Sequence, residues 1–322
     1  MIIASAPAKT ILFGEHFVVK GYPAIAIALN VRSNVKVSRH GDLNIKVKSL
    51  NLGEEMIIDL NGKPVRPSPN LTPYIKIFEM LANYCNLKQA YIEIKSDIPI
   101  AAGLGSSASI AVALTAAYSR YLGLSLSLDE ISRIAYESEK IVHGKPSGID
   151  NSIATYGGGI VFEKGKIRRI NIDKLSEAFI IIANTGIERS TRDAVLKVLR
   201  LYDKYESILM HVYEASRNLV NEAIKHIEEG NLRELGELMN INHGLLSAIG
   251  VSMLELEELV YIARKAGALG SKITGAGLGG CIIALSTKDN VEEVERALKV
   301  KAKWVLKASL SMDGVRVMEK EH

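Results

Sequence analysis

A glycine- and serine-rich stretch, AAGLGSSAS at residues 101–109, separates two segments of different pattern. Before it, AYIEIKSDIPI alternates apolar and polar residues, as a strand with one buried face does. After it, SSASIAVALTAAYSRYL at 106–122 has a helical composition and is apolar on almost every side, which is typical of a helix buried between layers. A strand, a tight glycine turn and a buried helix in this order indicate a mixed α and β fold with a helix N-terminus open to a ligand.

The first candidate ligand is a dinucleotide. Gly103, Gly105 and Ala108 satisfy the GxGxxG/A fingerprint between a strand and a helix. A dinucleotide fold also needs a second strand that ends in an acidic residue about 20 positions later. Asp129 instead opens a helix, so the nicotinamide interpretation lacks its second element.

The second candidate is a nucleotide phosphate. Free N–H groups and the helix dipole favour a phosphate at such a turn, and the Ser106 and Ser107 hydroxyls are suited to phosphate oxygens or Mg²⁺. A helix start capped by serines is the alternative without a ligand. A second glycine loop, KITGAGLGGC at 272–281, precedes a strand rather than a helix, and two such loops could hold one polyphosphate.

Composition sets the organisation of the chain. Its 322 residues exceed the ~250–300 at which single cores stop growing, so two domains are expected. All eight prolines lie at or before Pro146, and the chain becomes helix-rich after 173, which predicts domains 1–173 and 174–322. Asp313-Gly314 predicts a hairpin turn between the last two strands.

Charge and cysteine content exclude several classes of function. The net charge is only +4 and no Lys/Arg run occurs, so no nucleic-acid partner is expected. Two distant cysteines indicate neither a disulfide framework nor a zinc site. The sequence shows no signal peptide and no apolar stretch near the ~20 residues of a spanning helix, so we expect a cytoplasmic protein without a membrane partner.

Two further clusters carry charged residues. APAKTILFGEH contains Lys9, Glu15 and His16, and ESEKIVHGKPSGIDNSIATYGG contains Glu139 and Asp150. Taken singly, Lys9 fits a solvated strand end, Asp150 a helix cap and Glu139 a surface charge.

The four stretches PAKTILFGEHFVVKG, GLGSSAS, KPSGIDNSIATYGG and KITGAGLGGC, in this order, resemble the GHMP kinases, named for galactokinase, homoserine kinase, mevalonate kinase and phosphomevalonate kinase. The resemblance spans residues 5 to about 285. It implies an α+β fold of two domains, the first like domain 2 of ribosomal protein S5 and the second ferredoxin-like, with the active site in the cleft between them. Many relatives are homodimers, so a homodimer is expected.

The resemblance also implies roles for single residues. Asp150 and Lys9 would be catalytic, and Ser107 and Glu139 would hold Mg²⁺. The motifs look most like those of members that phosphorylate mevalonate, whose carboxylate an Arg fork would match. Substrate binding is thereby assigned to Glu15, His16, Lys20, Asp150, Thr191 and Arg192, with Arg189 as another candidate for the anion. ATP phosphate binding is assigned to Pro99, Ala101, Ala102, Gly103, Leu104, Gly105, Ser106, Ser107, Ala108, Ser109, Gly275, Ala276 and Gly277.

Three interpretations remain open from the sequence. The first is an ATP-dependent kinase that acts on the 5-hydroxyl of mevalonate. The second is a sister kinase of the same fold that acts on another small alcohol or on phosphomevalonate, against which the segment GEHFVVKG speaks. The third is a nicotinamide oxidoreductase or a non-catalytic nucleotide-binding module. Neither glycine loop has the full sequence context of a dinucleotide fold, which disfavours the oxidoreductase. The presence of Lys9, Glu139 and Asp150 together disfavours the module.

Overall fold

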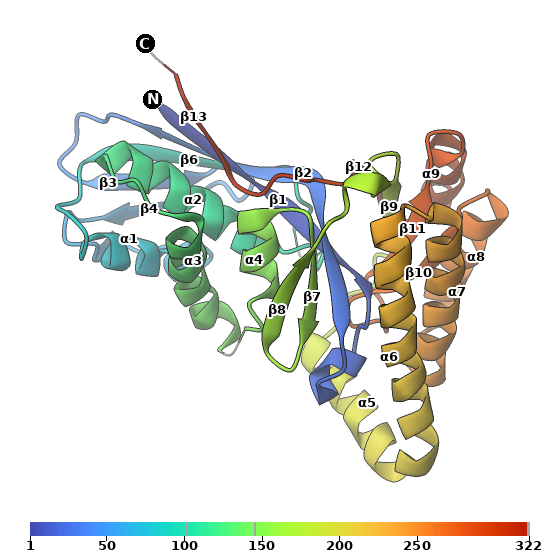
Figure 1. The fold of residues 1–322 in the computed structure, drawn as a ribbon. Coiled ribbons are helices and arrows are strands. Elements are labelled where there is room, and N and C mark those ends of the chain that lie inside the picture. The colour runs from blue at the N-terminus through green and yellow to red at the C-terminus, as the bar shows by residue number, and fades with distance from the viewer. Residues whose placement is uncertain (101, 145, 321–322) are drawn as a thin grey trace. The chain divides into compact units, whose positions relative to one another are not determined.

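The computed structural model describes residues 1–100, 102–144 and 146–320, which form two compact units (Figure 1). Unit 1 contains Met1–Lys9, Val31–Gly157 and the C-terminal segment from Asp313 onward, and unit 2 contains Thr10–Asn30 and Gly158–Met312. Strands β1 (Ile2–Phe13) and β2 (Ala24–Ser38) contribute residues to both units. The predicted boundary at residue 173 stays a prediction.

The sheet of unit 1 is built largely from antiparallel pairs. The second half of β2 pairs with β6, β6 pairs in parallel with β3, and β4 and β5 follow at the edge. The start of β1 pairs with the last strand of the chain. The bounds are β3 (Ile45–Ser49), β4 (Glu54–Ile58), β5 (Pro64–Arg66), β6 (Ala90–Ser96) and β13 (Arg316–Glu319).

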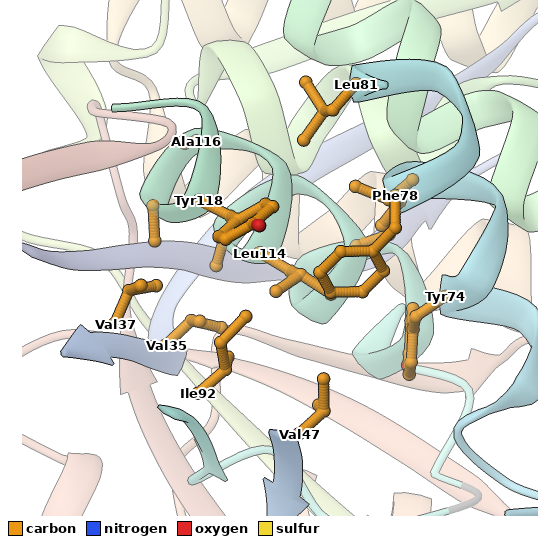
Figure 2. Packing of buried hydrophobic residues seen from close by; sticks show 14 of the residues in the cluster. Val35, Val37, Val47, Tyr74, Phe78, Leu81, Ile92, Leu114, Ala116 and Tyr118 are labelled. Atoms are coloured by element: carbon orange, nitrogen blue, oxygen red, sulfur yellow. The ribbon is translucent and has the colours of Figure 1, made fainter. Parts of the chain in front are cut away.

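Helices of unit 1 bury their apolar residues against this sheet. In Figure 2, Val35, Val47 and Ile92 from the strands lie near Phe78 and Leu114 from the helices, and all five are buried. Burial of each such side chain contributes roughly 1.5–3 kcal/mol. The bounds are η2 (Thr72–Tyr74), α1 (Ile75–Leu81), α2 (Ser106–Leu122), α3 (Leu128–His143) and α4 (Ile149–Tyr156).

Helix α2 is buried on nearly all sides, as its composition predicts. It packs against α3, α4 and β6, and its small residues Ala111, Ala113 and Ala117 permit close approach. The Tyr118 hydroxyl, held deep in the core, donates a hydrogen bond of 2.7 Å to the Lys88 carbonyl. A well-packed α2 gives the glycine loop at its N-terminus a fixed support.

Unit 2 contains a four-stranded antiparallel sheet in the order β10-β11-β9-β12. Four long helices in sequence, within the region predicted to be helical, precede β10. The start of β2 pairs with a hairpin of β7 and β8, whose turn contains Gly165 at a positive φ. The bounds are η1 (Phe17–Lys20), β7 (Gly159–Glu163), β8 (Lys166–Ile170), η3 (Asp173–Leu175), β9 (Phe179–Asn184), α5 (Thr191–Lys204), α6 (Glu206–Glu229), α7 (Leu232–Ala248), α8 (Leu254–Lys265), β10 (Gly270–Thr274), β11 (Cys281–Ser286), α9 (Val291–Lys299) and β12 (Trp304–Ser309).

Helix α7 lies directly on β10 because two glycines meet there. A Cβ atom on Gly270 would lie 2.1 Å from the Gly236 carbonyl oxygen, and one on Gly236 would lie 2.4 Å from the Leu269 carbonyl. Neither position therefore accepts a side chain. This close packing fixes β10, the strand that leads into the second glycine loop.

The prediction of a hairpin at Asp313-Gly314 is wrong. Strand β12 pairs with β9, and β13 pairs with β1, so the last two strands are not neighbours. Gly314 does not have the positive φ that a type I′ turn requires. A Cβ atom there would lie 1.9 Å from the Thr155 carbonyl oxygen, so glycine serves close packing instead.

Candidate active site

The first glycine loop has the geometry of an anion-binding turn. Gly103 and Gly105 adopt φ values of +75° and +73°, which strain any residue except glycine. Within the described residues, no side chain caps the N-terminus of α2, so its first N–H groups remain available to a ligand. Ala101, also predicted for this loop, lies outside the described residues.

Lys9 and Asp150 lie beside this loop. The Lys9 Nζ is 3.3 Å from Asp150 Oδ1, and their side chains are 11% and 34% exposed. Lys9 comes from β1, and its backbone N–H donates to the Leu104 carbonyl at 2.9 Å. Asp150 stands in the first turn of α4, after Gly148 at φ +81°. A Cβ on Gly105 would meet Lys9 Cγ at 3.0 Å and Asp150 Oδ2 at 3.4 Å, so the three residues form one site.

The three serines of the loop have different partners. Ser107 Oγ donates to Glu139 Oε1 at 2.8 Å. Ser106 Oγ lies 3.4 Å from Ser96 Oγ, and the fully buried Ser109 donates to the Ala6 carbonyl at 2.7 Å. Only the Ser107 hydroxyl therefore meets a carboxylate among the hydrogen bonds of these three.

Ser107 and Glu139 fit a Mg²⁺ ion. Both present oxygen atoms, which Mg²⁺ prefers, and Mg²⁺ is commonly held by one or two carboxylates together with phosphate oxygens and water. Burial raises the pKa of Tyr74, and the negative charge of Glu139 raises it further. Glu139 and Asp150 line one pocket of about 200 Å³. The described residues contain no cluster of three His, Cys, Asp or Glu that could hold a metal ion.

The second glycine loop, residues 275–280, is held in place within unit 2. Gly275, Gly277, Gly279 and Gly280 all have positive φ, as does Leu278 at +54°. The Leu278 N–H donates to the Val251 carbonyl, and the Gly280 N–H donates to the Ile187 carbonyl.

Arg189 packs its guanidinium group on this second loop. A Cβ on Gly275 would lie 2.8 Å from its Nη2, and a Cβ on Gly280 would lie 2.5 Å from its Nε. Burial lowers the pKa of Arg189, and its buried Nη1 has no hydrogen-bond partner among the described residues. The second glycine loop therefore packs around the Arg189 guanidinium, which the sequence analysis named only as another candidate for binding the carboxylate of the substrate.

His16 contacts the same loop. Its backbone has a φ of +63°, and its Nε2 lies 2.9 Å from the Ala276 carbonyl oxygen. Burial lowers the pKa of His16, the bond to Ala276 opposes that shift, and the charge of Arg189 adds to the lowering. A carbonyl only accepts, so the neutral ring carries its proton on Nε2.

The carboxylate of Glu15, the preceding residue, accepts a hydrogen bond from the Lys272 ammonium in an ion pair with both side chains almost fully buried. Sequence reasoning did not assign Lys272 a role. The only feature of the sequence that could have indicated a role for Lys272 is its place in the short strand that leads into the second glycine loop.

The remaining predicted substrate residues lie on or near α5. Thr191 and Arg192 are exposed in its first turn, where Ser190 caps the helix by accepting from the Asp193 N–H at 3.2 Å. Lys20 does not stand free: its Nζ lies 3.6 Å from the centre of the Tyr202 ring and 3.8 Å from Asp203 Oδ1.

Comparison with known proteins gives matches over nearly the whole chain. The profile of the GHMP kinases N terminal domain matches residues 73–159, and that of the GHMP kinases C terminal domain matches residues 222–303. The mevalonate kinase of Aeropyrum pernix is 40% identical over 98% of both chains. The mevalonate kinase of Pyrococcus horikoshii is 39% identical over 99% of this chain and 98% of its own length.

Solved structures agree with these matches. The crystal structure of the Methanococcus jannaschii mevalonate kinase superimposes with a TM-score of 0.85 at 30% identity, covering 96% of this chain and 98% of that one. The structure of L. major mevalonate kinase in complex with R-mevalonate gives a TM-score of 0.79 at 29% identity, covering 95% and 94%.

Proposed function

Because this chain belongs to the mevalonate kinases of the GHMP kinase family, we propose that it transfers the γ-phosphoryl group of ATP to the 5-hydroxyl of mevalonate. The products are 5-phosphomevalonate and ADP. The observation that carries the chemistry is the Lys9–Asp150 pair beside the glycine loop of α2. A carboxylate, a cation and free helix N–H groups are the groups that phosphoryl transfer to an alcohol requires.

Asp150 acts on the acceptor alcohol. Its carboxylate accepts the proton of the 5-hydroxyl as the alcohol oxygen attacks the γ-phosphorus and the bond to the ADP oxygen breaks. Lys9, 3.3 Å away, holds that carboxylate in place and places a positive charge beside the transferring group. The N–H groups at the start of α2 bind the phosphate oxygens of ATP.

Ser107 and Glu139 would hold Mg²⁺. When bound, the ion neutralises charge on the phosphate oxygens. Ser107 also lies in the loop that binds the phosphates, so the metal ligand and the phosphate-binding N–H groups come from one segment.

The rest of mevalonate includes a carboxylate, which requires a cationic partner. We assign Arg192 to its carboxylate, because an exposed guanidinium at a helix start offers two parallel N–H donors. Thr191 and His16 are the neutral hydrogen-bonding groups of this set. The charged groups of Glu15 and Lys20 are engaged by Lys272 and Asp203, and we assign them no contact with mevalonate.

Gly275, Ala276 and Gly277 remain candidates for phosphate contacts, with positive φ at both glycines.

We further infer a cytoplasmic homodimer that acts without nucleic acid or a membrane. No helix in the described part of the chain has the length and apolar character needed to cross a membrane. Light scattering of the purified chain tests the dimer.

The activity is tested by ADP release with mevalonate and with a panel of alcohols that includes galactose, homoserine and phosphomevalonate. We expect turnover with mevalonate and with none of the other alcohols, and ³¹P NMR should place the new phosphate on the 5-oxygen. Turnover with another alcohol and none with mevalonate would support the sister-kinase interpretation instead.

A further inference from the structure

Lys272 and Glu15 form a buried ion pair that the proposed chemistry does not use. Their side chains are 0% and 1% exposed, and Lys272 also donates to the Ile273 carbonyl at 2.7 Å. Transferring two charges out of water is costly, and pairs of this kind are best known for fixing the register of two segments rather than for adding stability. The segments joined here are the Gly14–His16 turn and strand β10.

The pair belongs to a row of contacts on alternate residues. Lys272 contacts Glu15, Thr274 Oγ1 lies 3.1 Å from Thr10 Oγ1, and the Ala276 carbonyl binds His16. Residues two apart on a strand share one face, so positions 272, 274 and 276 present one side to the N-terminal segment. The row runs from the middle of β10 into the second glycine loop.

The turn that Lys272 holds requires glycine at position 14 and is strained at His16. Gly14 has a φ of +92°, and a Cβ there would lie 2.4 Å from the Pro23 carbonyl oxygen. His16 has a φ of +63°, which is uncommon for a residue with a side chain. Such conformations persist only where the surrounding structure imposes them, and Glu15 stands between the two.

We propose that Lys272 is a positioning residue, which acts through Glu15 to hold the Gly14–His16 turn and thereby the bond from His16 to Ala276 in the second glycine loop. The pair keeps both its charges away from the substrate. Glu15 is then a positioning residue too, and it does not exchange a proton with the alcohol. This inference rests on the proposed function for its kinetic consequence but not for its structural one.

Three variants separate positioning from stability. Lys272→Met leaves the Glu15 charge buried without its partner and should lower the Tm by about 10 °C. The double variant Lys272→Met/Glu15→Gln removes both charges at similar volume and should regain most of that Tm. Glu15→Asp keeps both charges but shortens the carboxylate arm, so the turn must shift.

We expect kcat to fall in variants whose Tm is close to that of the wild type. The double variant and Glu15→Asp should lose about 100-fold in kcat, because displacing a contact network by about 1 Å costs that much. ATP affinity should fall by a smaller factor than kcat, since the loop before α2 is unchanged and only the candidate phosphate contacts of the second glycine loop shift. Leu259→Ala, a buried change in α8 outside the row of contacts, should lower the Tm with kcat retained.

A second readout does not need the substrate. Hydrogen exchange of the amides in residues 273–282 should accelerate at least 10-fold in Glu15→Asp and in the double variant, and not in Leu259→Ala. Wild-type exchange together with wild-type kcat in Glu15→Asp would overturn the positioning role. If the wild-type enzyme is inactive on mevalonate, the proposed function fails, and the exchange result alone decides the role of Lys272.

Discussion

The ammonium of Lys9 lies 3.3 Å from the carboxylate of Asp150, and Gly105 is the residue that lets both approach the start of α2. Both charges are partly exposed, so a substrate hydroxyl can reach them. This pair turns a helix N-terminus, which any anion could occupy, into a site with a proton acceptor at a defined place.

The first prediction concerns that pair. Asp150→Asn should lower kcat by at least about 1,000-fold, because the amide cannot accept the hydroxyl proton, while ATP binding persists. Lys9→Met should lower kcat by about 100-fold. In the double variant the two losses should be far from additive, since both residues act on one step. ADP release and equilibrium binding of ATP are the measurements, and retained turnover in Asp150→Asn would remove that residue from its role.

The second prediction concerns Gly105. Gly105→Ala should abolish ATP binding and activity, because its Cβ must fit 3.0 Å from Lys9 Cγ at a φ of +73°. Gly123→Ala is the matched control: it lies at the other end of α2 with a φ of +90° and nothing within 4 Å of a new Cβ. The control should show the backbone strain alone, about 1–3 kcal/mol of stability, with normal ATP binding. Equal behaviour of the two variants in calorimetric ATP titrations would count against a phosphate at this loop.

The third prediction distinguishes two serines of one loop. Ser107→Ala should raise the Mg²⁺ concentration needed for half-maximal activity by about 10- to 100-fold, because Glu139 then lacks its hydroxyl partner at the metal. Ser109→Ala removes a buried bond to the Ala6 carbonyl and should cost about 1–3 kcal/mol of stability with an unchanged Mg²⁺ requirement. Mg²⁺ titrations of the initial rate measure both. An unchanged titration in Ser107→Ala would exclude it as a ligand.

Some features of the fold and the site can be predicted from the sequence, and others cannot. The α+β fold that the resemblance to the GHMP kinases implied is confirmed. Four motifs in a fixed order carried that resemblance, and each of them is a local pattern of residues. The resemblance paired Ser107 with Glu139, and the two are hydrogen-bonded. The partners of Ser106 and Ser109 could not be predicted, since they lie on β6 and β1, which only the tertiary fold brings to the loop. Neighbouring letters of one motif thus serve different purposes.

The contact of Lys272 could not be predicted from the sequence for a related reason. Its partner Glu15 lies 257 positions away, and only the pairing of β10 with its neighbours fixes the face on which Lys272 lies. The Asp313-Gly314 hairpin failed in the same way, because a turn signal is local whereas strand pairing is not. Long-range pairing decided both outcomes.

The fourth prediction concerns the mevalonate carboxylate. Arg192→Ala should raise the KM for mevalonate by about 10- to 100-fold with the KM for ATP unchanged, as expected for the loss of a charge-assisted bidentate contact. Arg189→Lys is the comparison, because Arg189 is packed on Gly275 and Gly280 and should affect the second glycine loop and thus kcat. Initial-rate kinetics with each substrate varied decide between them. If the rise in mevalonate KM followed Arg189→Lys instead, the carboxylate would be reassigned to Arg189.

The last prediction is a dependence of stability on pH. Burial lowers the pKa of both His16 and His243, so these histidines bind a proton more readily in the unfolded chain than in the folded one. For a group with a lowered folded-state pKa of this type, stability is complete above the unfolded pKa of about 6.5 and falls as the pH drops below it. The Tm should therefore decrease between pH 7.5 and 5.5. His243→Gln, whose amide can still donate to Glu257, and His16→Gln, which can still donate to Ala276, should each flatten that decrease. Scanning calorimetry across this range is the measurement, and a double variant that loses as much Tm as the wild type would show that other groups cause the dependence.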